Sequence, residues 1–136
     1  MNKQMNAKDI LKNAYVDVTL SYTELINAKE PLTMLAQQRF KVILAFKLSV
    51  TLKKLDDLVE KFYKTRKKIL DDMGTLNPET NKYEFEPEKE KEAGIMIQQL
   101  LDQKNTISIV PVKLHEFEDE RIEPRILSLL DWLVIE

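Results

Sequence analysis

Residues 40–73, FKVILAFKLSVTLKKLDDLVEKFYKTRKKILDDM, decide the fold of this chain. Apolar residues recur along the stretch at alternating steps of three and four, which is the spacing of one face of an α-helix. This stripe comprises Leu48, Leu52, Leu55, Val59, Phe62, Ile69 and Met73, and Arg66 alone interrupts it. The sequence therefore predicts one helix of about 50 Å, ended by Gly74 in a left-handed conformation. A helix of that length has to lie against other parts of the chain.

A second helix is predicted over Pro87–Lys104, where Ala93, Ile97 and Leu100 repeat at helical spacing. The connector between the two helices is about a dozen residues long, so an antiparallel helical hairpin is the simplest arrangement. Within the connector, Asn77-Pro78-Glu79-Thr80 is typical of a turn, and Tyr83 and Phe85 alternate with acids. We expect a small β-excursion at the tip of the helix pair.

Two short strands are predicted outside the helix pair. Tyr15–Leu20 is rich in β-branched and aromatic residues, and Thr106–Leu114 places Ile107 and Ile109 on one face before Pro111. Antiparallel pairing of these strands would hold the two ends of the helix pair together.

Shorter helices are predicted beside the strands. Ser21 and Glu24 fit a capping box that opens a helix, which Glu30-Pro31 should end before a next helix over Leu32–Gln38. The apolar segment Pro124–Ile135 is predicted as a C-terminal helix buried on most sides. The fold class is therefore mainly α, with a minor α+β component: a long antiparallel helical hairpin, one or two short strands and a C-terminal helix. Residues 15–136 form a single domain, and residues 1–14 form a polar tail or a short helix.

Composition points to an ordinary soluble domain. The 136 residues are 43% hydrophobic and 32% charged, and none is cysteine, which excludes disulfides and thiolate metal sites. No apolar run is long enough for a signal peptide or a membrane span, so we expect no membrane partner. The expected location is the cytoplasm of the cell, or a larger particle that assembles there.

Charge is distributed unevenly although the net charge is only −2. Residues 39–68 carry ten lysines and arginines against three acids, whereas residues 71–92 carry eight acids against three lysines. From Lys113 to the C-terminus, seven acids face three bases. The long helix is thus basic and its flanks are acidic.

The sequence predicts no catalytic residue and no cofactor. Two glycines cannot make a phosphate-binding loop, and no serine or cysteine lies in a nucleophile motif. The single histidine, His115, could bind a metal only together with the acids Glu116, Glu118, Asp119 and Glu120, and we favour an acidic surface loop instead. Asp56 and Glu60 are expected to pair with lysines one helical turn away, such as Lys53 and Lys64.

A basic cluster lies in the second half of the long helix, and it has two interpretations. It comprises Lys61, Lys64, Arg66, Lys67 and Lys68. It could contact nucleic-acid phosphates, with Phe62 and Tyr63 available to stack on bases. Alternatively, the hairpin sets it opposite Glu86, Glu88, Glu90 and Glu92, which would neutralise it and supply the carboxylate that Arg66 needs. We favour the second interpretation because the whole chain is acidic.

Several apolar and aromatic residues lie off the main stripe and are candidates for contact with a partner. They are Leu58, Tyr63, Leu70, Tyr83, Phe85 and Trp132. The alternative for the aromatic members is packing in the core or at the tip. At the start of the long helix, Phe40, Ile43, Leu44 and Phe46 are apolar nearly all round, and we expect them at the base of the core.

The order of elements resembles a known class of proteins. Three segments carry the resemblance: the run ELINAKEPLTMLAQQRFKVILAFKLSVTLKKLDDLVEKFYKTRKKILDDMG, the acidic connector and the closing EPRILSLLDWLVIE. In these segments the chain is similar to small, uncharacterised helical-hairpin proteins encoded by tailed bacteriophages and prophages. The resemblance implies a phage origin and a non-enzymatic accessory role, and it carries no active-site residue over.

Two functional hypotheses follow. The first is a non-enzymatic phage accessory protein that acts by protein–protein interaction or self-association, as a virion or assembly component or as an inhibitor of a host protein. The second is a nucleic-acid-binding protein that uses the basic half of the long helix.

Overall fold

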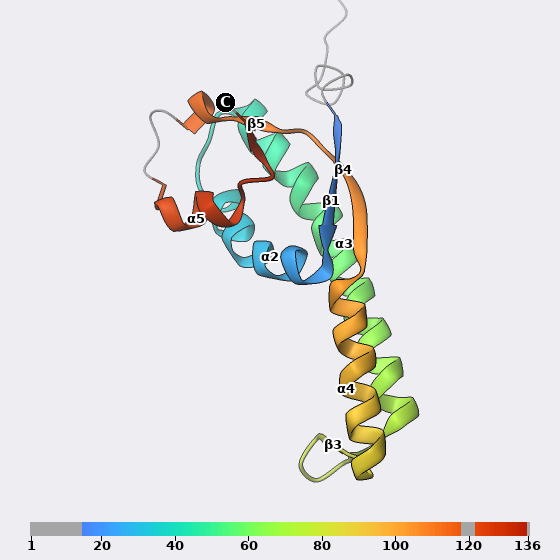
Figure 1. The fold of residues 1–136 in the computed structure, drawn as a ribbon. Coiled ribbons are helices and arrows are strands. Elements are labelled where there is room, and N and C mark those ends of the chain that lie inside the picture. The colour runs from blue at the N-terminus through green and yellow to red at the C-terminus, as the bar shows by residue number, and fades with distance from the viewer. Residues whose placement is uncertain (1–14, 118–121, 136) are drawn as a thin grey trace, which may run out of the picture.

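The structure is a computed structural model that describes residues 15–117 and 122–135 (Figure 1). It is mostly helical with small two-stranded sheets, which confirms the mainly α class. The predicted N-terminal segment 1–14 lies outside the described residues. In chain order the elements are β1 (Val16–Ser21), α2 (Tyr22–Ala36), α3 (Val42–Met73), β2 (Thr75–Asn77), β3 (Lys82–Glu84), α4 (Pro87–Asp102), β4 (Lys104–Ile109), β5 (Val112–Lys113), the 3-10 helix η1 (Leu114–Phe117), α5 (Pro124–Leu129) and β6 (Val134–Ile135).

Helix α3 is the predicted long helix and begins at Val42 instead of Phe40. Its end differs from the prediction, because Gly74 has φ −131° and ψ −179°, which is extended backbone and not the left-handed region. The glycine is needed for space. A Cβ at Gly74 would lie 2.6 Å from a ring carbon of Phe85 and 3.0 Å from the carbonyl oxygen of Glu84. The chain therefore turns off the helix close against the strand that returns to it.

Helix α2 corrects the prediction of a break at Glu30-Pro31. The capping box of Ser21 and Glu24 is present, but one helix then runs through Pro31 to Ala36. Leu25, Ala28, Leu32 and Leu35 form one buried face on both sides of the proline. Burial of that continuous face outweighs the backbone hydrogen bond that a proline removes.

The strand pair is present as predicted. Strands β1 and β4 are antiparallel, with Val16 opposite Ile109 and Val18 opposite Ile107. Ile107 and Ile109 are both buried, while the hydroxyl groups of Thr19 and Thr106 meet across the pair at 3.0 Å. Pro111 lies between β4 and β5, so the predicted strand Thr106–Leu114 is divided in two.

The C-terminal segment is only partly helical, in contrast to the predicted helix Pro124–Ile135. Helix α5 ends at Leu129, and β6 then pairs in parallel with β5, Val134 opposite Val112. Ile126, Leu130 and Leu133 are buried. The segment is therefore largely buried as expected, but the backbone leaves the helix so that Val134 and Ile135 can add a strand.

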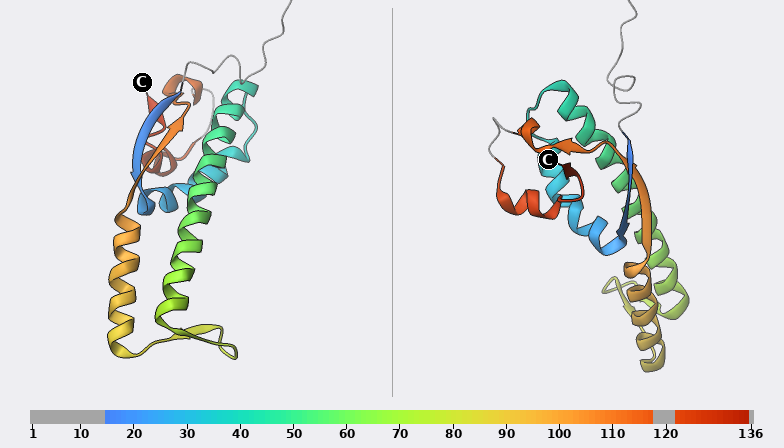
Figure 2. Two further views of the ribbon diagram at one scale, coloured as in Figure 1. Left: turned by 90° about the vertical axis from the view of Figure 1, so that its right-hand side faces the viewer. Right: turned by 45° about the horizontal axis from the view of Figure 1, so that its top comes forward.

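Figures 1 and 2 show a compact part from which a pair of helices projects. Helix α2, the first half of α3, the β1–β4 pair and α5 surround a common apolar core. Leu44 is buried in this core, and Phe40 packs on it, with its ring edge-on to Phe117 at 5.9 Å. Phe46 and Ile43 are only half-buried, so the expected base of the core is present but less complete than predicted.

Candidate functional site

The long helix leaves the apolar core at Phe62. The buried residues of α3 run from Leu44 to Phe62, and none of those after Phe62 is buried. In α4 the only buried residue is Ala93. We call residues 63–102 the arm and the other described residues the body. The arm consists of the last turns of α3, the β2–β3 hairpin at its tip and α4.

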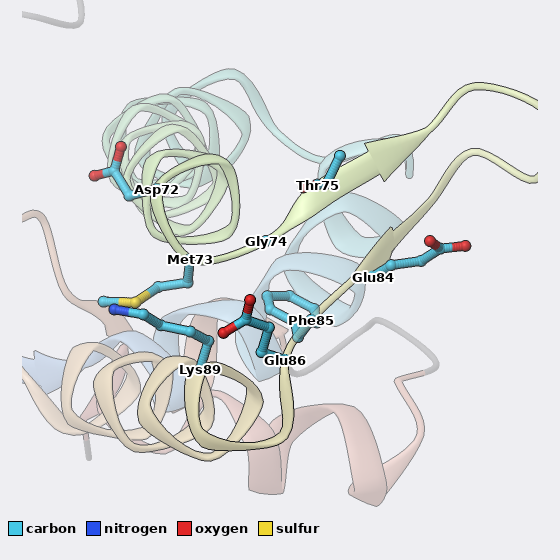
Figure 3. A pocket seen from close by; sticks show the side chains of 8 residues that line it. All are labelled: Asp72, Met73, Gly74, Thr75, Glu84, Phe85, Glu86 and Lys89. Carbon is cyan, nitrogen blue, oxygen red and sulfur yellow. The ribbon is translucent and has the colours of Figure 1, made fainter.

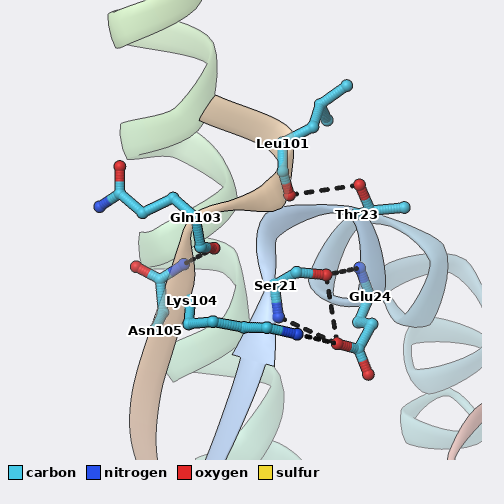
Figure 4. Close-up of polar contacts among 7 residues, drawn as sticks. All are labelled: Ser21, Thr23, Glu24, Leu101, Gln103, Lys104 and Asn105. Carbon is cyan, nitrogen blue, oxygen red and sulfur yellow. Dashed lines mark hydrogen bonds and ion pairs between the residues drawn. The ribbon is translucent and has the colours of Figure 1, made fainter. Parts of the chain in front are cut away.

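Polar contacts hold the base of the arm, and the two residues that follow it, to the start of α2 (Figure 4). The hydroxyl of Thr23 donates to the carbonyl oxygen of Leu101 at 3.3 Å, and the N–H of Tyr22 donates to that of Gln103 at 3.2 Å. The carboxylate of Glu24 pairs with Lys104 at 3.5 Å and accepts the Ser21 N–H, which lowers its pKa. The arm therefore leaves the body in a defined direction.

Apolar side chains of the arm remain accessible to solvent. Tyr63 on α3 is 51% exposed and Ile95 on α4 is 52% exposed. Other apolar residues of the two helices are half-buried: Ile69, Leu70, Met73, Met96 and Ile97. Two helices packed against each other can cover only one side of each, so part of this apolar surface has no covering layer.

The six candidate partner residues divide between the arm and the body. Tyr63 and Leu70 lie on α3 within the arm, and Tyr83 and Phe85 lie at its tip with their ring centroids 6.3 Å apart. Leu58 and Trp132 instead pack on the core of the body. The structure therefore brings four of the candidates to the arm. The sequence interpretation missed Ile95, although three consecutive apolar residues, Ile95 to Ile97, cannot all lie on one helix face.

A pocket of about 580 Å³ lies at the tip, between the end of α3 and the start of α4 (Figure 3). Figure 3 shows Met73, Phe85, Glu86 and Lys89 around the opening, whereas Asp72 and Glu84 point away from it. These groups do not include a nucleophile with an adjacent base. A second pocket of about 100 Å³ lies in the body between α2 and α5 and is lined in part by Pro31, Met34 and Leu129.

A polar network attaches the tip hairpin to α3. Lys67 donates to the carboxylate of Asp71 at 2.8 Å, and the Tyr83 hydroxyl donates to the same carboxylate. The Lys67 and Tyr83 hydrogen bonds lower the pKa of Asp71, and their bond to Asp71 raises the pKa of Lys67 and of Tyr83. Tyr83 therefore helps to hold the tip hairpin on α3.

The basic cluster does not face the acids of α4, and this corrects the prediction. Lys64 pairs with Glu60 at 3.1 Å and Lys67 with Asp71, both within α3. In the part of the chain that the structure describes, no ion pair joins α3 to α4, and Arg66 is exposed. The predicted carboxylate partner of Arg66 is therefore absent from these pairs.

Two fixed points explain why the opposite charges do not meet. At the tip, Met73 at the end of α3 and Lys89 at the start of α4 line the same pocket (Figure 3). At the base, Phe62 packs on Tyr22 with ring centroids 5.3 Å apart, and Tyr22 is bonded to Gln103. Residues 61–68 therefore lie beside the C-terminal half of α4, whereas the glutamates of residues 86–92 lie beside the last turn of α3.

Of the five candidate metal ligands, the structure describes two, His115 and Glu116. His115 is exposed, and Glu116 is used in an ion pair with Lys47 at 2.6 Å. Glu118, Asp119 and Glu120 lie outside the described residues. Over residues 15–117 and 122–135, no three histidine or acidic side chains are grouped so that they could hold a metal ion. Asp56 pairs with Lys29 of α2 at 3.8 Å and not with Lys53.

Comparisons with known proteins add no relative. The chain matches no protein-family model, no curated protein and no solved structure. Within the described segments, no helix has both the length and the apolar character needed to cross a membrane.

Proposed function

We propose that this chain is a non-enzymatic accessory protein that acts by binding another protein through its arm. The observation that carries the proposal is the change in burial along α3, which has no buried residue beyond Phe62 although its apolar pattern continues through Ile69, Leu70 and Met73. A helix pair that keeps its apolar pattern beyond the core is typical of a helix-docking surface. In this proposal the arm is the antiparallel helical hairpin that the sequence predicts.

The biological setting that we propose is a tailed phage or prophage. The resemblance to phage-encoded helical-hairpin proteins supports this setting, in which the protein would work in the cytoplasm of the host cell or in an assembled virion. The binding function rests on the arm and does not depend on the setting.

Nucleic-acid binding receives less support from the geometry than from the sequence. Two bases of the cluster, Lys64 and Lys67, are already paired with acids of α3. Phe62, one of the two rings expected to stack on bases, is buried against Tyr22.

Site-specific photo-cross-linking tests the proposed function. A benzophenone amino acid is placed at Tyr63 in the arm or, as the control, at Leu114 in the body, because these side chains are 51% and 50% exposed. We expect irradiation of cells that make the protein to give a discrete protein adduct from position 63 and none from position 114. Adducts of equal yield from both positions, or none from position 63, would contradict the proposal.

A further inference from the structure

We propose that the arm binds the arm of a second copy of this chain, with the two arms antiparallel and their four helices forming one bundle. This inference rests on the proposed function, because it names the protein that covers the arm.

The apolar surface of the arm fits this partner. Ala93 is the only buried residue of α4, and both helices keep exposed or half-buried apolar residues such as Tyr63, Leu70 and Ile97. A second helix pair laid across the first would cover this surface and form a four-helix bundle, in which every helix has two neighbours.

Two groups of charges, one in the arm and one at its base, have no ion pair among the described residues and are opposite in sign. The first group consists of the α3 bases Arg66 and Lys68, together with Lys61, which lies just before the arm. The second group consists of three acids at the start of α4, namely Glu86, Glu88 and Glu90. One chain therefore presents both halves of a charge pairing that it does not complete by itself.

The positions of these charges along the arm select the antiparallel arrangement. At 1.5 Å per residue, the three bases lie about 8 to 18 Å from the end of α3, whereas the three acids lie at the tip. The part of α3 in the arm is about 16 Å long. If two arms overlap over that length in opposite directions, the tip of each meets the base of the other. The acids of each copy then face the bases of its partner.

Two-fold symmetry makes this contact occur twice in one dimer. A parallel arrangement would instead set tip against tip, so that the acids of the two copies would face each other. The charge distribution therefore favours a second copy in the antiparallel orientation.

A charge-exchange experiment tests the dimer. One variant carries Lys61→Glu, Arg66→Glu and Lys68→Glu, and the other carries Glu86→Lys, Glu88→Lys and Glu90→Lys. The control carries Arg39→Glu, Lys41→Glu and Lys53→Glu, which reverse three exposed bases of the body. Mass is measured by light scattering over a dilution series, and helix content is measured by circular dichroism.

We expect the wild-type chain and the control to have the mass of a dimer. Each arm variant alone should have a dissociation constant raised at least about tenfold, because like charges then face each other. An equimolar mixture of the two arm variants should recover the dimer, since each supplies the charge that the other needs. A wild-type monomer throughout would overturn the proposal, and so would arm variants no weaker than the control, or a mixture that stays monomeric while both variants remain helical.

Cysteine cross-linking gives a second test that does not depend on the stability of those variants. The chain has no cysteine, so Asp72→Cys near the tip and Lys64→Cys near the base each create a single thiol. We expect a short bismaleimide to link a mixture of the two variants and to link Asp72→Cys alone poorly. Efficient linking of Asp72→Cys to itself, or no linking in the mixture, would overturn the antiparallel arrangement.

The two proposals fail in different ways. A monomeric chain whose position 63 still gives an adduct with another protein would remove self-association and leave the binding function in place. A chain that gives no adduct from position 63 would remove the binding function itself.

Discussion

Gly74 shows how one residue fixes the tip of the arm. A Cβ at Gly74 would lie 2.6 Å from a ring carbon of Phe85, which leaves no room for a side chain, whereas a Cβ at Gly94 would have nothing within 4 Å. We expect Gly74→Ala to lower the free energy of unfolding by about 1–3 kcal/mol, because the tip has to move. Gly94→Ala is the matched control and should raise it by about 0.5–1 kcal/mol, since alanine is the better helix former. Urea denaturation of both variants measures these changes, and equal effects at the two positions would contradict the steric explanation.

Glu116 makes the stability of the body depend on pH. Burial alone would raise the pKa of Glu116, but hydrogen bonds from Lys47 and from the N–H of Lys113 outweigh it and hold the pKa below its usual value. Because the folded-state pKa is the lower one, the contribution is complete above the unfolded value of about 4.3 and is lost as pH falls through the lowered pKa.

We therefore expect Glu116→Gln to reduce stability by about 2 kcal/mol at neutral pH and to reduce the acid sensitivity of unfolding. Denaturation at neutral pH and at acidic pH measures both effects. Glu60→Gln is the control, because the pair of Glu60 with Lys64 is exposed and should contribute less than about 0.5 kcal/mol. A Glu116→Gln variant with the same pH dependence as wild type would contradict this assignment.

At the scale of elements, α2 retains a proline that its own geometry disfavours. A proline inside a helix costs about 3 kcal/mol, while its replacement by alanine removes buried apolar surface worth about 1–2 kcal/mol. We expect Pro31→Ala to stabilise the chain by about 1 kcal/mol, as measured by denaturation. Pro87→Ala is the control at the first turn of α4, where a proline removes no helical hydrogen bond, and should change stability by less than about 0.5 kcal/mol. A destabilised Pro31→Ala variant would show that the proline ring is needed for packing.

The elements that local sequence signals determine were predictable. The 3-4 stripe predicts α3, Ser21 and Glu24 predict the start of α2, and the helices predicted to begin at Pro87 and Pro124 do begin there as α4 and α5. The helix through Pro31 and the strand β6 were not predictable, because each depends on surfaces supplied by distant parts of the chain: the core that receives the α2 face, and the edge of β5.

The candidate site was predictable only in part, for the same reason. The sequence identifies Tyr63, Leu70, Tyr83 and Phe85 as candidate contacts, and the structure places them on the arm. The sequence does not predict which turns of α3 face which turns of α4. That alignment depends on how many residues the tip hairpin uses, and it is why Glu88 and Glu90 do not meet Arg66.

At the scale of the whole molecule, α3 lies partly in the body and partly in the arm. The amide hydrogens of these two segments should therefore exchange with solvent at different rates. Residues 48–62 belong to the core, whereas residues 66–73 lie outside it and contact only α4 and the tip hairpin among the described elements. Local opening requires less free energy where few apolar side chains are buried. At concentrations where the chain is monomeric, we expect the amides of residues 66–73 to exchange at least about tenfold faster than those of residues 48–62. Hydrogen exchange with mass spectrometry resolves the two segments.

Raising the protein concentration should then protect the arm selectively. If arms pair with arms, amides in residues 66–73 and in α4 become buried in the bundle and exchange more slowly, while the β1–β4 pair is unaffected and serves as the internal control. The protection should be lost when Lys61, Arg66 and Lys68 are reversed to glutamate and should return when that variant is mixed with the one whose α4 glutamates are reversed to lysine. Uniform exchange along α3 at low concentration would contradict the division between body and arm. Arm protection that does not respond to concentration would contradict self-association while leaving that division intact.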